Sequence, residues 1–150
     1  MGGTGSSRWT TTITRVLADG LVRLDVRVLA RKGALRPGAR SNVTWGTGTA
    51  ITVEVPEDDD EVMCLAYGVQ MRGRAGATVA EHVRLMRTPC TFGAFRVWFA
   101  CPGCGRRCAV LYALAGRFTC RSCHHLAYAS TRQRRGRRHG VAHPGCRNND

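Results

Sequence analysis

Two pairs of cysteines constrain this chain more than any other feature of its sequence. Cys101 and Cys104 form one pair, Cys120 and Cys123 form the other, and two residues separate the members of each. Two intervening residues let the backbone curl into a knuckle that points both sulfurs at one ion. Two knuckles complete a tetrahedron, so the spacing predicts a closed four-thiolate site for one structural zinc ion.

The residues around and between the cysteine pairs predict the local fold of this site. Gly103 and Gly105 are expected to supply the positive φ values that a knuckle needs. Residues 108–113 and 117–120 are strand-like, with Gly116 at the turn between them. We therefore expect a β-hairpin capped by metal, the layout of a zinc ribbon, over residues 98–131. Zinc binding would stabilise a segment that is too small to fold alone.

The cysteines and the neighbouring histidines also allow alternatives to a four-thiolate zinc site. A redox dithiol needs a thioredoxin-like βαβ context, which this sequence lacks, and an iron–sulfur cluster is a further alternative. Cys108 is expected to be a buried small hydrophobe, although it lies close enough to compete as a ligand. His124 and His125 follow the last cysteine directly and are expected beside the site or on the surface.

The chain before the cysteines is predicted to be a β-rich domain over residues 9–97, after a flexible Gly/Ser-rich start at 1–8. Apolar side chains at near-helical spacing predict a short helix at about 24–32, stopped by Gly33, although alternation there also suits a strand. Segments with strand-like composition follow, and they predict an antiparallel β-meander. These segments span residues 42–45, 50–55, 62–69 and 78–86, and an earlier one spans 9–16. The fold class is small α+β or mainly β.

Aromatic residues gather just before the first cysteine pair, where Phe92, Phe95, Trp98 and Phe99 fall within eight residues. We expect them to pack between the sheet and the metal module. The alternative is base stacking, because exposed ring faces suit unpaired bases.

Positive charge is concentrated toward the end of the chain. The net charge is +13; residues 1–100 hold 13 basic and 9 acidic side chains, and residues 101–150 hold 10 basic and one acidic. This asymmetry favours a polyanionic partner, usually nucleic acid, although a solvated arginine-rich tail explains it equally well. Residues 132–150 lack apolar periodicity and are predicted to be a disordered basic tail.

These features predict a zinc-ribbon protein that associates with nucleic acid through largely non-sequence-specific arginine contacts. The arginines assigned to those contacts lie around the knuckles and in the tail: Arg106, Arg107, Arg117, Arg121, Arg132, Arg134, Arg135, Arg137 and Arg138. One alternative is a protein–protein interaction adaptor stabilised by zinc. Another is a thiol redox or metal sensor that uses Cys108.

Several function classes find no support in the sequence. There is no nucleophile elbow, no His-Glu-x-x-His motif, no phosphate-cradling glycine loop and no paired-carboxylate constellation, so we do not expect an enzyme. No helix-turn-helix is evident, so specific base readout is not expected. No secretory signal and no long apolar run is present, and we therefore expect a cytoplasmic protein without a membrane span.

Residues 23–131 resemble a bacterial family of zinc-ribbon proteins that is common in proteobacteria, often prophage-associated, and without an established activity. The resemblance is carried by residues 98–107, 111–112, 118–123 and 126–130, and upstream by 24–31, 35–38, 44–45 and 88–93. It implies a β-domain followed by a zinc ribbon. Family members continue past the position of Ser130 with a Gln, an acidic residue and a basic helical stretch. This chain departs from that pattern with an arginine-rich segment that ends in Asn-Asn-Asp.

Overall fold

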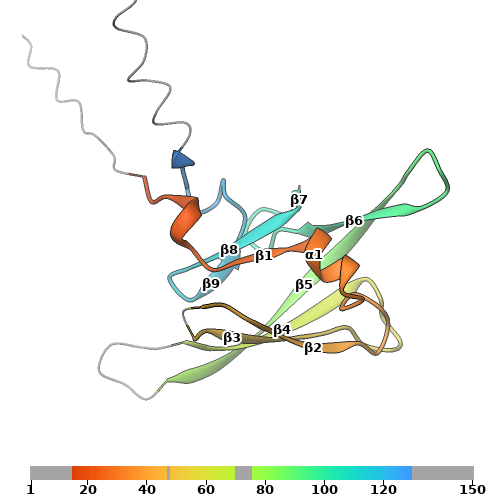
Figure 1. The fold of residues 1–150 in the computed structure, drawn as a ribbon, viewed down its shortest axis with the longest axis horizontal. Helices are drawn as coiled ribbons and strands as arrows, with labels where there is room; N and C mark the ends of the chain where they lie inside the picture. Colours follow the sequence, from red (N-terminus) through yellow and green to blue (C-terminus); the bar gives the residue numbers. More distant parts are fainter. Residues whose placement is uncertain (1–14, 47, 70–75, 130–150) are drawn as a thin grey trace, which may run out of the picture.

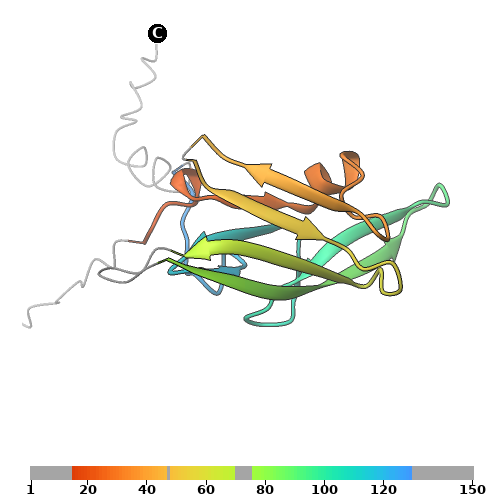
Figure 2. The same ribbon diagram turned by 90° about the horizontal axis from the view of Figure 1, so that it is seen from below.

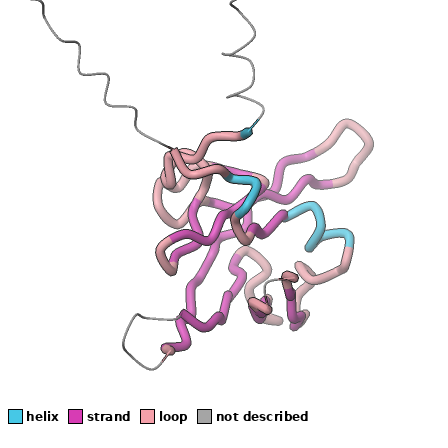
Figure 3. The backbone as a smooth tube through the Cα atoms, turned by 60° about the vertical axis from the view of Figure 1, so that its left-hand side comes forward, coloured by secondary structure: helices cyan, strands magenta, loops and turns pink. Residues whose placement is uncertain are grey.

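Strands are the main regular structure in the described part of the chain, and the one α-helix there is short (Figure 3). The computed structural model describes residues 15–46, 48–69 and 76–129. Its elements are η1 (Ala18–Gly20), β1 (Arg23–Asp25), α1 (Val26–Arg31), β2 (Arg40–Thr44), β3 (Ala50–Glu54), β4 (Val62–Val69), β5 (Ala77–Pro89), β6 (Phe95–Ala100), β7 (Arg107–Cys108), β8 (Val110–Leu114) and β9 (Arg117–Thr119). The predicted start at 1–8 and tail at 132–150 lie outside these residues, as does most of the strand expected at 9–16.

Six strands form an antiparallel sheet in the order β2-β3-β4-β5-β6-β7 (Figure 1). Every second side chain of β4 faces the core. Met63, Leu65 and Tyr67 are buried, and the residues between them are half-buried. Cross-strand neighbours share a face, so Val53 of β3 and Val83 of β5 extend the same apolar surface. The predicted mainly-β antiparallel fold with one short helix is confirmed.

Strand β5 is longer than expected and continues into a hairpin with β6, a strand that the sequence did not predict. Figures 1 and 2 show this hairpin projecting beyond the other strands. The expectation that four aromatics pack between sheet and metal module is wrong for two of them. Phe99 is fully buried and Trp98 is half-buried, whereas Phe92 is 98% and Phe95 66% exposed. The two exposed rings lie where the hairpin has left the core.

A second, three-stranded antiparallel sheet has the order β1-β8-β9. Residues 108–113 were expected to form one strand, but the chain changes sheets at Ala109. Its carbonyl accepts a hydrogen bond from the Val26 amide (2.9 Å) instead of continuing the ladder of β7. Cys108 therefore pairs with Phe99 in the six-stranded sheet, whereas Val110 belongs to the other sheet.

Helix α1 is shorter than the predicted 24–32 because strand β1 includes Leu24 and Asp25. The strand and the helix that the sequence suggested for this segment both occur, with the strand first. Asp25 is the N-cap, and its carboxylate accepts a hydrogen bond from the Arg27 amide (2.9 Å). Gly33, with φ of 71°, follows the end of the helix, as expected of a residue that adopts the left-handed conformation.

One hydrophobic core unites the segment predicted as a β-rich domain with the segment predicted as the ribbon. Leu111 and Phe118 of the β8–β9 hairpin belong to the same buried cluster as Leu24 of β1 and Met63 of β4. The rings of Tyr67 and Phe118 meet edge to face at 5.0 Å between centroids. No helix in the described part of the chain is both long and apolar enough to cross a membrane.

Candidate metal centre

The structure brings the four cysteines of the two pairs together, as the spacing predicted. The first knuckle lies between β6 and β7 and the second follows β9, and the four Sγ atoms all lie within 4.8 Å of one another. The Cys101–Cys123 and Cys104–Cys120 Sγ atoms are each 3.8 Å apart. Four sulfurs at about 2.3 Å from a central zinc ion are separated by about 3.8 Å in a regular tetrahedron. The arrangement therefore fits one tetrahedral metal ion.

Both of these 3.8 Å contacts join sulfurs of different knuckles. Two independent redox dithiols would not require such contacts between the pairs. Backbone hydrogen bonds fold the first knuckle: the Gly105 amide donates to the Cys101 carbonyl (2.8 Å) and the Cys101 amide to the Arg106 carbonyl (2.9 Å). The Cys120 amide donates to Cys101 Sγ (3.2 Å). This contact joins the knuckles and offsets thiolate charge.

The two glycines of the first knuckle have different roles. Gly105 has φ of 69°, as predicted. Gly103 does not adopt positive φ, and that expectation is wrong. It faces a crowded interior instead: a Cβ at this position would lie 3.1 Å from Cys123 Sγ and 3.3 Å from Thr119 Cγ2. Glycine is needed there because the second knuckle and β9 approach its backbone closely.

The thiols of the cluster have divergent proton affinities. The backbone amide and then the guanidinium of Arg106 donate to Cys104 and lower its pKa to about 6. Desolvation, followed by hydrogen bonds from the other thiols, raises the pKa of Cys123 to about 12. Crowded thiols resist carrying several negative charges unless a cation is present. A bound divalent metal reverses this because it stabilises every thiolate that contacts it.

The remaining candidate ligands lie outside the cluster. Cys108 is half-buried and packs against the main core, and burial raises its pKa to about 12. The ring of His124 lies with Nε2 3.0 Å from the Tyr112 carbonyl, so it donates to β8. His125 is exposed and has φ of 51°. His124 therefore anchors the second knuckle to the β8–β9 hairpin.

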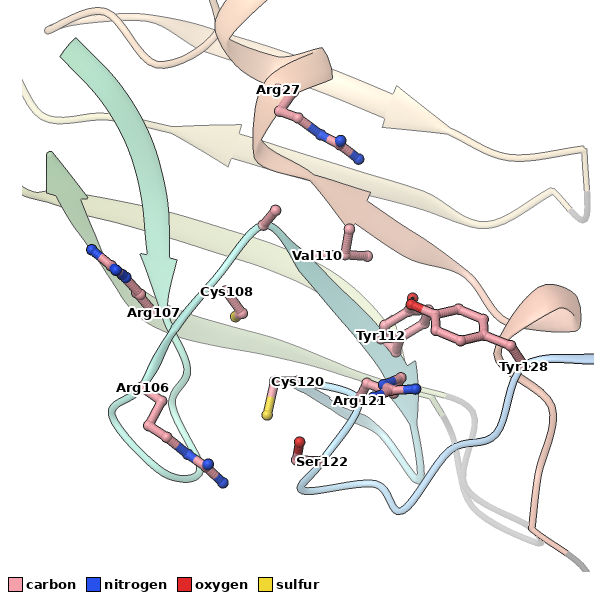
Figure 4. Close-up of a pocket in the computed structure, with 11 residues that line it drawn as sticks. Arg27, Arg106, Arg107, Cys108, Val110, Tyr112, Cys120, Arg121, Ser122 and Tyr128 are labelled. Atoms are coloured by element: carbon pink, nitrogen blue, oxygen red, sulfur yellow. The ribbon is translucent and has the colours of Figure 1, made fainter. Parts of the chain in front are cut away.

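A pocket of about 410 Å³ lies beside the metal centre (Figure 4). Three of the predicted arginines line it, together with Arg27 of α1, which the sequence did not single out. No acidic residue lines it. The lining residues with polar or charged groups are Arg27, Arg106, Arg107, Cys108, Tyr112, Cys120, Arg121, Ser122 and Tyr128. Arg27 comes from a distant part of the sequence, so only the pairing of β1 with β8 could have placed it here.

The predicted arginines do not all lie together. Arg106, Arg107 and Arg121 line the pocket, whereas Arg117 begins β9 near Tyr67 and is not among the lining residues. The five tail arginines lie outside the described residues. Three of the four knuckle arginines therefore line one pocket, although their side chains do not all point the same way (Figure 4).

The acidic turn at 57–61 does not neutralise the arginines of the pocket. Its Asp60 pairs with Arg87 (2.8 Å) and its Glu61 with Arg84 (3.9 Å). Within the pocket, Arg27 pairs with Asp25 (2.6 Å).

Among the described residues, the other three pocket arginines form no ion pair with an acid. Arg106 contacts Cys104, Arg107 lies by the ring of Trp98, and Arg121 lies over the ring of Tyr128. None of the three guanidinium groups is neutralised by a carboxylate, and that of Arg106 is shared with the Cys104 sulfur.

Comparison of the chain with protein-family models, with curated proteins and with solved structures finds no match. The resemblance to a bacterial zinc-ribbon family stays a prediction. The four-cysteine cluster is the part of it that the structure supports.

Proposed function

We propose that this chain holds one structural zinc ion and binds nucleic acid through the arginines beside it. The observation that carries the proposal is the pocket next to the cysteine cluster, which Arg106, Arg107 and Arg121 all line. Among the described residues, none of the three forms an ion pair with a carboxylate. Guanidinium groups bind phosphates strongly and bidentately, and such contacts carry little sequence information.

In this proposal the metal acts on structure and not on substrate. Four thiolates fill the coordination sphere of zinc and leave no position for water, so we assign no reaction to the site. The ion would join the two knuckles. It would thereby keep Arg106 and Arg107, which follow the first knuckle, near Arg121 of the second knuckle. Thiolate ligands persist in a reducing compartment, which agrees with a cytoplasmic location.

The zinc content is tested by elemental analysis of the purified protein together with titration of released metal by a colorimetric chelator. We expect one zinc per chain in the wild type and none in Cys120→Ser. An iron–sulfur cluster would instead give visible absorption and acid-labile sulfide, and that result would overturn the zinc assignment.

Nucleic-acid binding is tested by fluorescence anisotropy with labelled oligonucleotides across a salt series. Replacing Arg106, Arg107 and Arg121 together by Gln removes three phosphate contacts, which should lower the slope of log affinity against log salt by about 2 for single strands. The matched control replaces three arginines outside the pocket, Arg36, Arg40 and Arg117, by Gln.

The control makes the result specific to the pocket because both triple variants lose the same charge. An equal loss of affinity in both triple variants would mean that net charge alone drives binding, and it would contradict the proposal. A further variant truncated after Thr131 measures the contribution of the tail. Absence of binding at low salt in the zinc-loaded wild type would also overturn the proposal.

One observation favours a protein-binding adaptor as the second candidate. At the tip of the β5–β6 hairpin, Phe92 is almost completely exposed and Phe95 is about two-thirds exposed. Exposed aromatic rings that project from a fold are typical of protein contact sites. A photo-crosslinker placed at position 92 would then trap one defined partner, while a crosslinker at Arg36 would not.

A further inference from the structure

The outer face of the six-stranded sheet carries a second group of arginines around a tryptophan. Phe99 and Val97 of β6 point toward the core, so Arg96 and Trp98 point to the opposite side. The register places Met86 of β5 across from Trp98. It also places Arg107 of β7 across from Ala100, on the same outer side. We call Met86, Arg96, Trp98 and Arg107 the outer strip.

The indole ring of Trp98 is fixed on the outer strip, and the guanidinium groups of Arg96 and Arg107 lie over it. Its indole Nε1–H donates to Thr88 Oγ1 (3.0 Å), which fixes the orientation of the ring. The guanidinium carbon of Arg96 lies 4.3 Å from the ring centroid and that of Arg107 lies 5.6 Å from it. Trp98 as a residue is half-buried, so part of it remains accessible. A base that stacks on the face covered by Arg96 would take the place of that guanidinium, which would then be free to move to a phosphate. A fixed ring with flanking cations is the combination that binds a base together with its phosphates.

The outer strip is continuous with two hollows in the surface. On the outer face, Met86 helps line a pocket of about 290 Å³ beside the first knuckle, together with Arg84, Ala100 and Pro102. At the edge strand β7, Arg107 belongs both to the strip and to the arginine pocket of the metal centre. Figure 4 shows its side chain pointing away from Arg121, toward the side of the pocket opposite the tyrosines.

We propose that the outer strip binds single-stranded nucleic acid, with a base stacked at Trp98 and adjacent phosphates on Arg96 and Arg107. This inference rests on the proposed function, because the same strand would continue over β7 to the arginine pocket. Bases in a duplex have their faces covered by their neighbours, and only an unpaired base can offer a face to a ring. The strip therefore favours single strands over duplex.

Charge argues for a polyanion over a protein at this surface. The strip contains two guanidinium groups, and among the described residues neither forms an ion pair. Stacking on a tryptophan next to arginines gives sequence-tolerant affinity, because every base has a π face. The preference would thus be for strand type, not for sequence.

The test compares oligothymidine with an abasic strand of equal length and with a duplex, all bound to the zinc-loaded full-length chain. The abasic strand has the same phosphates but no bases. Stacking at one ring should make oligothymidine bind the wild type about ten-fold more tightly than the abasic strand. Trp98→Leu should remove that ratio, Trp98→Phe should retain most of it, and duplex binding should not change.

Phe95→Leu is the matched control because it lies on the same strand but alternates to the other face. Zinc content and circular dichroism of each variant establish that the fold is retained. Equal affinity of the wild type for oligothymidine and the abasic strand would overturn the inference. The proposed function would then still stand if the pocket triple variant loses affinity for both strands. If no oligonucleotide binds at low salt, both proposals fail.

Discussion

Gly103 and Gly105 stand two residues apart in the first knuckle, but glycine is required at each for a different reason. Gly105 needs the left-handed conformation, which asparagine also tolerates, whereas Gly103 needs the space that a Cβ would occupy. We expect Gly105→Ala to cost about 1 kcal/mol of folding free energy, and Gly105→Asn to cost less.

At Gly103 both Ala and Asn should weaken zinc binding, because any Cβ pushes against Cys123 Sγ. Competition with a chromophoric chelator measures the zinc affinity of the four variants. Restoration of affinity by Asn at Gly103 would show that the backbone conformation, and not the close approach, requires glycine there.

Thr119 presents a buried hydroxyl next to the metal centre. Its Oγ1 has no hydrogen-bond partner among the described residues, and the side chain is 8% exposed. A buried polar group without a partner is destabilising, so Thr119→Val should raise the free energy of unfolding by about 1 kcal/mol. Chemical denaturation at constant zinc concentration measures the change. Thr119→Ser is the control that keeps the hydroxyl, and a loss of stability in Thr119→Val would mean that the hydroxyl has a partner in solution.

At the scale of elements, α1 depends on the residue that caps its start, because six residues form few internal hydrogen bonds. Asp25 caps the helix, and its hydrogen bond to the Arg27 side chain (2.6 Å) lowers the pKa of its carboxyl group. Asp25→Ala should therefore destabilise the protein by about 1 kcal/mol at neutral pH. Asp25→Asn, which can still cap, should cost less.

The pH dependence of this effect follows from the sign of the shift. A carboxyl whose pKa is lowered in the folded state stabilises the fold above its unfolded pKa, and this stabilisation is lost as pH falls through the folded value. The difference in Tm between wild type and Asp25→Ala should be constant from about pH 8 to pH 5.5 and narrow only below about pH 4. Thermal scans of both proteins at matched pH and zinc concentration measure it, and a difference that shrinks already between pH 8 and 6 would contradict the assignment.

At the scale of the whole molecule, the metal centre and the β-meander share one core. Leu111 and Phe118 pack with Met63 and Leu24, and β1 pairs with β8. Loss of zinc should therefore weaken the whole fold in one transition and not only the knuckles. At a free zinc concentration about 1,000 times the dissociation constant, the ion contributes about 4 kcal/mol, which corresponds to roughly 10 °C in Tm for a chain of this size.

Differential scanning calorimetry with and without a strong chelator measures this shift. The wild type should show a single transition under both conditions, at a lower temperature with chelator. Cys108→Ala serves as the control, because its sulfur lies outside the cluster and the shift should persist in it. Two separate transitions, one of them insensitive to the chelator, would mean that the two parts fold independently.

Local sequence patterns predicted the four clustered cysteines and most of the strands. The two cysteine pairs act within a few residues, and strand β4 spans the predicted residues 62–69 because alternation is a property of neighbouring positions. The same patterns contain no information on pairing partners. Strand β6, the change of sheet at Ala109 and the short helix after β1 all follow from contacts between distant segments.

The candidate site also has a part that the sequence predicts, the cysteine cluster, and a part that depends on tertiary structure, the arginine pocket. The cysteine spacing already predicted four sulfurs arranged to hold one ion, since each knuckle is a local turn. The sequence also placed Arg106, Arg107 and Arg121 near the knuckles. Only the tertiary structure added Arg27 from α1 and left Arg117 out of the pocket. The net charge of a segment can be counted from its sequence. Which charged side chains share a surface depends on which strands pair, and burial of the shared core sets that long-range pairing, not a local motif.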